Sequence, residues 1–431
     1  MFLMLSDIHF DPFQDDAVIG KLGAKLREGC HTSGSTSFSR YGSDTNYPLL
    51  KSALENAAAA ASDHHFHYDY IIITGDYLAH QFDRRYQQCI GGSDEAYRRF
   101  ASGTIVLVSD MIARAFPGVP VFAALGNNDS DRGDYEKPSE SFFSSVGHSW
   151  ETAWGDVAAR TRSEAEASFE KAGYYALPHP TVPGHELLVL NSNLWAAAHH
   201  PQACSETDSD PDGQFAWLSD TLDKVARTGG SASLIMHILP GIDAIRSAGG
   251  QPVLLWNDRC TQKLMTQLNR YPGVIREIYA GHIHRDDFRV LEDIPGRALC
   301  AIHVVPSVSP VYFNNPALEI GWYSKSDGAL WDYAALSLNL SGPKPTWETE
   351  YVFTQAYGYP RLTLNALEDL SRRIRSGNPA SGVGKIYTSH YTAGVDMFLT
   401  PQNWLNYSCA QTEITIETFE RCTGTVADHR P

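Results

Sequence analysis

The sequence has 431 residues, a formal net charge of −16 at pH 7, and 43% hydrophobic and 11% aromatic residues. This is enough apolar material for a sizeable buried core, and a chain of this length can still fold around one catalytic unit. The acidic charge and the lack of a Lys/Arg run argue against nucleic-acid binding, and no segment approaches the roughly 20 apolar residues that span a bilayer.

The first 130 residues alternate between strand-like and helix-like segments. Short apolar runs predict strands buried on both faces, over residues 1–6, 69–74 and 120–125. An Ala-rich segment and a segment with an apolar stripe predict helices between them, over residues 48–62 and 94–115. This alternation predicts a largely parallel sheet with helices packed on it.

The alternation continues further along the chain. Residues 131–172 are polar and helix-like. Strands and helices are then expected, in chain order, over residues 173–178, 185–195, 215–226, 233–237, 259–269 and 274–281. After residue 285 the pattern is mostly β, with one clear helix over residues 364–376. We expect a catalytic domain over residues 1–350 and a C-terminal region over residues 351–431.

Seven cysteines are present, and none forms a CxxC pair, which argues against a zinc ribbon. Cys409 and Cys422 enclose a short polar segment that suits a disulfide, and Cys30 and Cys89 lie in loop-like segments and could form another. Buried free thiols are the alternative. The odd count leaves at least one thiol unpaired within a monomer.

Five short polar segments each follow an expected strand. They are SDIH (6–9), GDYLAH (75–80), GNND (126–129), His237 and GHIH (281–284). Open α/β sheets place their ligands at the carboxyl ends of strands, so these segments are expected to meet. Their glycines predict sharp turns and a close approach of the backbone to the site.

These segments offer a set of mixed nitrogen and oxygen ligands, namely Asp7, His9, Asp76, Asn127, His237, His282 and His284. Mixed imidazole and carboxylate ligation suits Zn, Fe or Mn better than Ca or Mg. Seven ligands with one shared carboxylate can hold two divalent metal ions, as in hydrolytic phosphatases and nucleases. One such segment alone carries little weight, because single motifs often occur by chance.

The order DxH, GD, GN, H, GHxH resembles the calcineurin-like metallophosphoesterase superfamily. Further segments resemble its acid sphingomyelinase-like phosphodiesterases over nearly the whole chain: GDYLAH, YYAL with LNSNLW, FAWLSDTLDK, PSVSPVYFNNPAL and WETEYVFTQAYG. The resemblance implies a mixed α/β fold, a four-layer αββα sandwich of two mixed β-sheets flanked by helices. It also implies a small helical C-terminal region packed on the catalytic domain, zinc as the favoured metal, and an exported setting.

Carried over onto this sequence, the resemblance implies two metal sites. It puts Asp7, His9, Asp76 and His284 on the first metal, and Asp76, Asn127, His237 and His282 on the second. Asp76 would bridge them, and a water or hydroxide between the metals would attack phosphorus in line.

One position departs from the pattern. The superfamily usually has GNH where this chain has Asn128, and that histidine lies near the leaving group. An amide cannot donate a proton as an acid does, so His80 of GDYLAH becomes the candidate general acid; a hydrogen-bonded loop histidine is the alternative. A phosphate leaving group needs less protonation than an alkoxide, which shifts the expectation toward phosphoanhydrides.

We therefore expect a dimetal hydrolase of phosphodiester or phosphoanhydride bonds. Its substrate would be a small-molecule or lipid phosphate ester, a nucleotide or polyphosphate. The alternatives are a phosphomonoesterase on the same metal centre and a non-catalytic metal-bearing protein. The setting is expected to be periplasmic, extracellular or lysosomal-like, with the signal peptide absent from this sequence. His199 and His200 stay unassigned.

Overall fold

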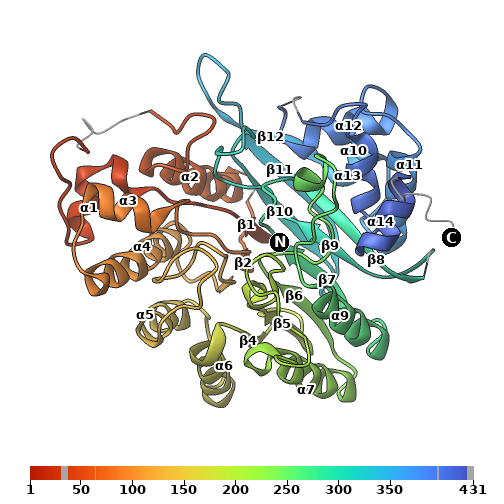
Figure 1. Ribbon diagram of the computed structural model, residues 1–431, viewed down its shortest axis with the longest axis horizontal. Coiled ribbons are helices and arrows are strands. Elements are labelled where there is room, and N and C mark those ends of the chain that lie inside the picture. Colours follow the sequence, from red (N-terminus) through yellow and green to blue (C-terminus); the bar gives the residue numbers. More distant parts are fainter. Residues whose placement is uncertain (31–36, 64, 295, 396–397, 425–431) are drawn as a thin grey trace.

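Two mixed β-sheets lie at the centre of the computed structural model, and helices flank them (Figure 1). The structure describes residues 1–30, 37–63, 65–294, 296–395 and 398–424. The first sheet has the strand order β12-β11-β10-β1-β2-β3, and the second has the order β4-β5-β6-β7-β9-β8. The expected sandwich of two mixed sheets is confirmed.

The first sheet joins the N-terminal strands to strands from much later in the chain. Its strands are β1 (Phe2–Leu5), β2 (Tyr70–Ile73), β3 (Val121–Ala123), β10 (Ala317–Tyr323), β11 (Leu330–Leu338) and β12 (Trp347–Val352). The first three run parallel, as predicted, with Phe2 opposite Tyr70 and Ile71 opposite Val121. β10, β11 and β12 add to the other edge of β1 in antiparallel order.

The second sheet is parallel at its centre and antiparallel at both edges. Its strands are β4 (Tyr175–Pro178), β5 (His185–Val189), β6 (Ser231–Ile235), β7 (Ile275–Ala280), β8 (Asp287–Ile294) and β9 (Arg297–Val304). β5, β6, β7 and β9 run parallel, while β4 and β8 pair antiparallel with their neighbours.

Helices lie outside the sheets, with α1–α4 on one side of the molecule and α10–α14 on the other (Figure 1). Those before β10 are α1 (Asp16–Lys21), α2 (Tyr47–Asp63), α3 (Phe82–Cys89), α4 (Asp94–Ala115), α5 (Glu140–Glu151), α6 (Ala159–Ala172), α7 (Gln214–Arg227), α8 (Ala244–Ser247) and α9 (Asp258–Arg270). Short 3-10 helices are η1 (Pro12–Gln14), η2 (Ser192–Trp195) and η3 (Pro211–Gly213). The long α4 shows why these segments are helical: Ser93 caps its first turn by accepting from the Ala96 amide, and Arg114 lies in its last turn.

The C-terminal region is helical, but it holds more helices than the single one predicted. The helices after β12 are α10 (Phe353–Tyr357), α11 (Leu364–Arg375), α12 (Gly382–Tyr391), α13 (Trp404–Ala410) and α14 (Ile416–Thr423). Only α11 has a strong apolar stripe over several turns; the others are short, and tertiary packing stabilises them. The boundary at residue 350 falls near the end of β12 and stays a prediction.

The space between the sheets is filled by aromatic side chains from both. Phe2 stacks on Tyr70 at 4.7 Å between ring centroids and meets Tyr279 of the other sheet edge to face at 5.7 Å. A polar pair also bridges the sheets, because His303 Nε2 lies 2.6 Å from Glu319 Oε2. These contacts hold the two sheets in one fixed relation, on which the site at their common edge depends.

Three disulfides cross-link the chain. The suggested pairs Cys30–Cys89 and Cys409–Cys422 are both present, and Cys204–Cys260 is a third that the sequence did not indicate. Cys300 is buried and unpaired. Across the described part of the chain, no helix is both long enough and apolar enough to cross a membrane.

Candidate metal centre

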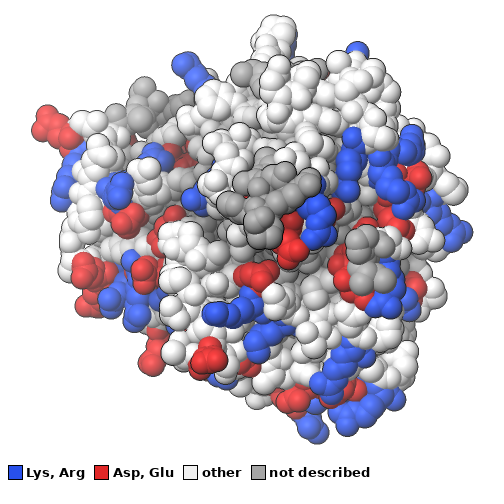
Figure 2. All heavy atoms as spheres, turned by 45° about the vertical axis from the view of Figure 1, so that its right-hand side comes forward, with Lys and Arg blue, Asp and Glu red and all other residues white. Residues whose placement is uncertain are grey.

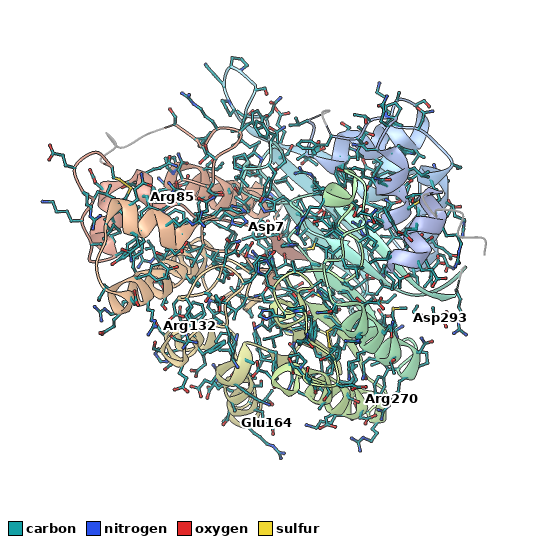
Figure 3. The ribbon with its side chains drawn as sticks, viewed as in Figure 1. Asp7, Arg85, Arg132, Glu164, Arg270 and Asp293 are labelled. Carbon is teal, nitrogen blue, oxygen red and sulfur yellow. A yellow bond between two sulfur atoms is a disulfide. The ribbon has the colours of Figure 1, made fainter. Side chains whose placement is uncertain are left out.

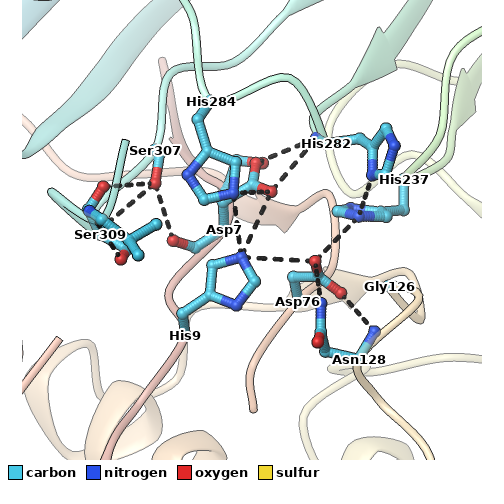
Figure 4. A network of polar contacts seen from close by, with 12 residues as sticks. Asp7, His9, Asp76, Gly126, Asn128, His237, His282, His284, Ser307 and Ser309 are labelled. Atoms are coloured by element: carbon cyan, nitrogen blue, oxygen red, sulfur yellow. Dashed lines mark hydrogen bonds and ion pairs between the residues drawn. The ribbon is translucent and has the colours of Figure 1, made fainter. Parts of the chain in front are cut away.

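The five polar segments all begin at the carboxyl ends of parallel strands. Segments 6–9, 75–80 and 126–129 follow β1, β2 and β3 in the first sheet. His237 follows β6 and segment 281–284 follows β7 in the second sheet. The sandwich brings both sets of strand ends together near the middle of the molecule, where Asp7 lies (Figure 3), and their side chains converge (Figure 4).

Three predicted ligand atoms lie around a fourth, His9 Nε2. His9 Nε2 lies 3.0 Å from His284 Nε2, 3.4 Å from Asp76 Oδ2 and 3.8 Å from Asp7 Oδ1. His284 Nε2 lies 3.3 Å from the same Asp7 oxygen. These are the four residues predicted for the first metal.

A second group shares the Asp76 oxygen. His237 Nε2 lies 3.1 Å from Asp76 Oδ2 and 3.1 Å from Asn127 Oδ1. His282 Nδ1 lies 3.3 Å from His237 Nε2. The structure thus brings together all seven predicted ligands, in two groups that meet at one carboxylate oxygen.

The contacts between neighbouring ligand atoms have the spacing expected around a metal ion. Donors bound at zinc–ligand distances in a tetrahedron lie about 3.4 Å from one another, and the separations found are 3.0 to 3.8 Å. His9 Nδ1 donates to the Leu78 carbonyl and His237 Nδ1 donates to the Thr74 carbonyl, both at 2.9 Å. These bonds leave the two Nε2 atoms free to face a cation.

Five of the seven residues have left-handed backbone conformations. Their φ angles are 47° at Asp7, 43° at His9, 59° at Asp76, 74° at His282 and 56° at His284. Non-glycine residues rarely adopt this region, and such strain clusters at functional sites where surrounding structure enforces it. The sharp turns aim these side chains inward at the ends of their strands.

Glycines make the close approach feasible, as predicted. A Cβ on Gly126 would collide with the backbone nitrogen and carboxylate of Asp76, and one on Gly281 would collide with Ser6 Oγ. Both positions therefore require glycine for steric reasons.

Within the buried cluster, two histidines have raised pKa values and two have lowered ones. Burial lowers the pKa of His9 and of His237, but the nearby carboxylates, above all Asp76, outweigh it and raise these pKa values to about 10 and about 9. Burial and the neighbouring imidazolium charges lower the pKa of His282 to about 3 and that of His284 well below its usual value. Burial opposes ionisation of Asp76, but the His237 and His9 charges hold its pKa low. The cluster therefore attracts positive charge, and a metal ion must compete with protons for it.

His80 stands beside the first group and is held by a carboxylate. Its Nδ1 lies 2.9 Å from Asp44 Oδ1, its backbone N–H donates to Asp44 Oδ2, and its ring stacks on His9 at 4.0 Å. The Tyr312 hydroxyl lies 3.2 Å from His80 Nε2. Burial would raise the pKa of Asp44, but the hydrogen bond from His80 and nearby histidine charges hold it below its usual value.

Asn128 lies against the shared carboxylate rather than against His80. Its backbone N–H donates to Asp76 Oδ1 at 2.8 Å, and its side-chain amide donates to Asp76 Oδ2 at 2.9 Å. These bonds orient Asp76. A role for Asn128 at the leaving group stays a prediction.

Several supporting residues were not foreseen. Asp129 accepts from the backbone N–H groups of Asp76, Tyr77, Leu78 and Gly126, and so ties the second and third segments together. Only its place in the GNND motif hinted at a role. Nothing in the sequence alone marks Asp44, because the contact with His80 spans 36 residues.

Two further residues orient ligands from outside the cluster. Asp134 accepts from Asn127 Nδ2 at 2.7 Å, which turns the amide oxygen toward His237. Arg285 is buried and donates to the carbonyls of His284 at 2.9 Å and Tyr312 at 3.2 Å. A buried arginine that binds two loops fixes both in place.

A family model and several known proteins match this chain. The family described as calcineurin-like phosphoesterase matches residues 1–286, which include all seven predicted ligands. The human acid sphingomyelinase-like phosphodiesterase 3b is 25% identical, over 98% of this chain and 89% of that protein. Cyclic GMP-AMP phosphodiesterase SMPDL3A of Rattus norvegicus is 28% identical, over 86% of this chain and 80% of that protein. Sphingomyelin phosphodiesterase B of Dictyostelium discoideum is 27% identical, over 87% of this chain and 57% of that protein.

Proposed function

The chain belongs to the calcineurin-like phosphoesterase family and is a hydrolytic enzyme, and from this premise we propose that it cleaves phosphodiester or phosphoanhydride bonds at a dimetal centre. The observation that carries the proposal is the pair of ligand groups that share Asp76 Oδ2.

We assign the first metal to Asp7, His9, Asp76 and His284, and the second to Asp76, Asn127, His237 and His282. The mixture of imidazole, carboxylate and amide donors supports zinc, with iron and manganese as alternatives. When bound, the two ions would lower the pKa of a water and draw charge from the phosphoryl oxygens.

The chain's own residues would position the proton donor for the leaving group. Asp44 fixes the His80 ring by accepting from Nδ1, which leaves Nε2 directed toward Tyr312 and the space beside the first metal group. Asp44 thereby fixes the ring orientation that a general acid needs to deliver a proton to the leaving oxygen.

We further propose a preference for leaving groups that need little protonation. Asn128 cannot act as a second acid, and its amide hydrogens are directed at Asp76. A departing phosphate carries its charge more readily than an alkoxide. Nucleoside polyphosphates, inorganic polyphosphate and activated diesters are therefore favoured over sphingomyelin-type esters.

The three disulfides support an exported location, because such bonds persist in oxidising compartments. The whole chain has a net charge of −16, and Lys/Arg and Asp/Glu side chains are intermixed on the face shown in Figure 2. The acidic net charge disfavours binding of a nucleic-acid backbone.

The test is hydrolysis of a substrate panel by the zinc-loaded enzyme, with and without chelator. The panel comprises ATP, short polyphosphate, sphingomyelin, bis-p-nitrophenyl phosphate and p-nitrophenyl phosphate. We expect chelator-sensitive turnover that favours the anhydrides and the diester. Preference for the monoester would indicate a phosphomonoesterase, and faster turnover of sphingomyelin than of ATP would contradict the leaving-group argument.

A second test isolates His80. The variant His80→Ala should lose about 10²–10⁴-fold in kcat on alkyl esters, the usual contribution of a general acid, and far less on p-nitrophenyl esters, whose leaving group needs no proton. Asp44→Asn should show the same pattern in weaker form. An equal loss on both ester types, with metal content unchanged, would show that His80 acts structurally.

A further inference from the structure

Aromatic side chains flank the ligand cluster on two sides. Tyr312 meets His284 edge to face at 4.6 Å and His80 at 5.5 Å, beside the first metal group. Tyr135 meets His282 edge to face at 6.5 Å, beside the second metal group. The candidate acid therefore lies beside the first metal group, and Tyr135 lies beside the second.

Tyr135 is paired with a histidine that the mechanism does not use. The rings of Tyr135 and His199 are parallel to within 4°, with centroids 3.7 Å apart, and His199 is exposed. His200 Nε2 lies 3.2 Å from the Tyr135 carbonyl oxygen, which ties the same two loops together. The pair forms one flat, two-ring stack at the margin of the site.

The backbone holds this stack in a fixed position. Tyr135 has a φ of 61°, a conformation that a bulky residue rarely adopts. Its N–H donates to the carbonyl of Asn127 at 2.7 Å, which couples the ring to a ligand residue. Strain at an aromatic residue next to a metal site indicates a functional constraint.

We propose that the Tyr135–His199 stack is the binding platform for the nucleobase of a nucleoside phosphodiester. This deepens the proposed function and rests on it. Base stacking on an aromatic ring needs a flat, pre-oriented face and tolerates any base. Tyrosine and histidine provide such a face here, within reach of a phosphate at the metal groups.

The position of the stack also determines which half of the substrate it takes. The leaving group departs toward the proton donor, on the side of His80 and Tyr312. In an in-line displacement the retained substituent lies to the side of the nucleophile–leaving group axis, and Tyr135 lies beside the second metal group, where it can receive that substituent. The platform therefore holds the nucleoside that stays on the phosphate, not the one that leaves.

A base suits this platform better than the quaternary ammonium of a choline ester. Quaternary ammonium groups are recognised by aromatic cages in which several ring faces converge. The two rings here are stacked on each other and present one plane. Asp134, the nearest carboxylate in sequence, is engaged by the Asn127 amide.

The experiment compares three diesters that release the same p-nitrophenol and differ only in the group that stays on phosphorus: thymidine, choline or methyl. For wild type we expect kcat/KM to be highest for the thymidine ester. In His199→Ala and in Tyr135→Leu, the ratio of kcat/KM for the thymidine ester to that for the methyl ester should fall about tenfold, as expected for loss of one stacking contact. Tyr135→Phe keeps the ring and should keep the ratio.

Controls make every outcome decisive. His148→Ala removes an exposed histidine on α5, remote from the ligand cluster, and should behave as wild type. Unchanged thymidine-to-methyl ratios in both His199→Ala and Tyr135→Leu would overturn the platform. A selective loss on the choline ester would overturn it in favour of a choline site. If metal-loaded wild type hydrolyses ATP but none of the three esters, the platform is overturned and the proposed function stands; if it hydrolyses neither ATP nor the esters, both fail.

Discussion

Burial of Glu277 should make the stability of the folded protein depend on pH. This side chain lies on β7, only 7% exposed, and burial raises its pKa from 4.5 to about 8, although a backbone hydrogen bond at Leu330 favours the charged form. In the unfolded chain Glu277 ionises above pH 4.5, whereas in the folded protein it keeps its proton to about pH 8. The folded state is therefore favoured below pH 4.5, and this advantage is lost as pH rises toward 8.

The magnitude follows from the two pKa values. One pKa unit corresponds to about 1.4 kcal/mol, so between pH 5 and pH 7 Glu277 alone should lower the free energy of unfolding by about 2–3 kcal/mol. For a chain of this length that corresponds to about 3 °C in Tm. Other buried carboxyls, such as Asp286 and Glu319, have pKa values shifted in the same direction by burial, so the effect of Glu277 must be isolated by substitution.

The assay is thermal unfolding of metal-saturated wild type and Glu277→Gln at pH 5 and pH 7. We expect the variant to lose about 3 °C less than wild type between the two pH values, because glutamine does not ionise. Glu348→Gln, at an exposed position on β12, is the matched control and should follow wild type. Identical pH dependence in wild type and Glu277→Gln would refute the assignment of a proton to buried Glu277.

Two further predictions concern positions outside the cluster. Arg285→Met removes the bonds to the carbonyls of His284 and Tyr312, and it should lower zinc affinity or kcat about 10–100-fold, as changes behind metal ligands usually do. A zinc titration and a kcat measurement check this. Unchanged values of both would contradict the positioning role of Arg285. The double variant Cys204→Ser/Cys260→Ser opens a loop with a sequence separation of 56 and should lose about 4 kcal/mol of stability, or about 4–5 °C in Tm, by thermal unfolding under oxidising conditions. An unchanged Tm would mean that the disulfide does not constrain the unfolded chain.

The sequence alone determined the elements that carry the site. Short apolar runs such as residues 70–73, rich in isoleucine, favour buried strands, and polar residues directly after them are expected at the sheet edge. The seven candidate ligands, the glycines beside them and the two-sheet fold could therefore be predicted, the last with the help of family resemblance. Local chemistry and spacing sufficed because each motif is contiguous in the chain.

Tertiary structure alone decided the contacts between segments far apart in the chain. The Asp44–His80 pair, the Arg285 bridge, the Cys204–Cys260 disulfide and the Tyr135–His199 stack each join residues whose local sequence gives no sign of the partner. Such pairings depend on how two sheets pack and where their loops meet, which no local period or propensity encodes. The short C-terminal helices were missed for the same reason, because packing rather than an apolar stripe stabilises them.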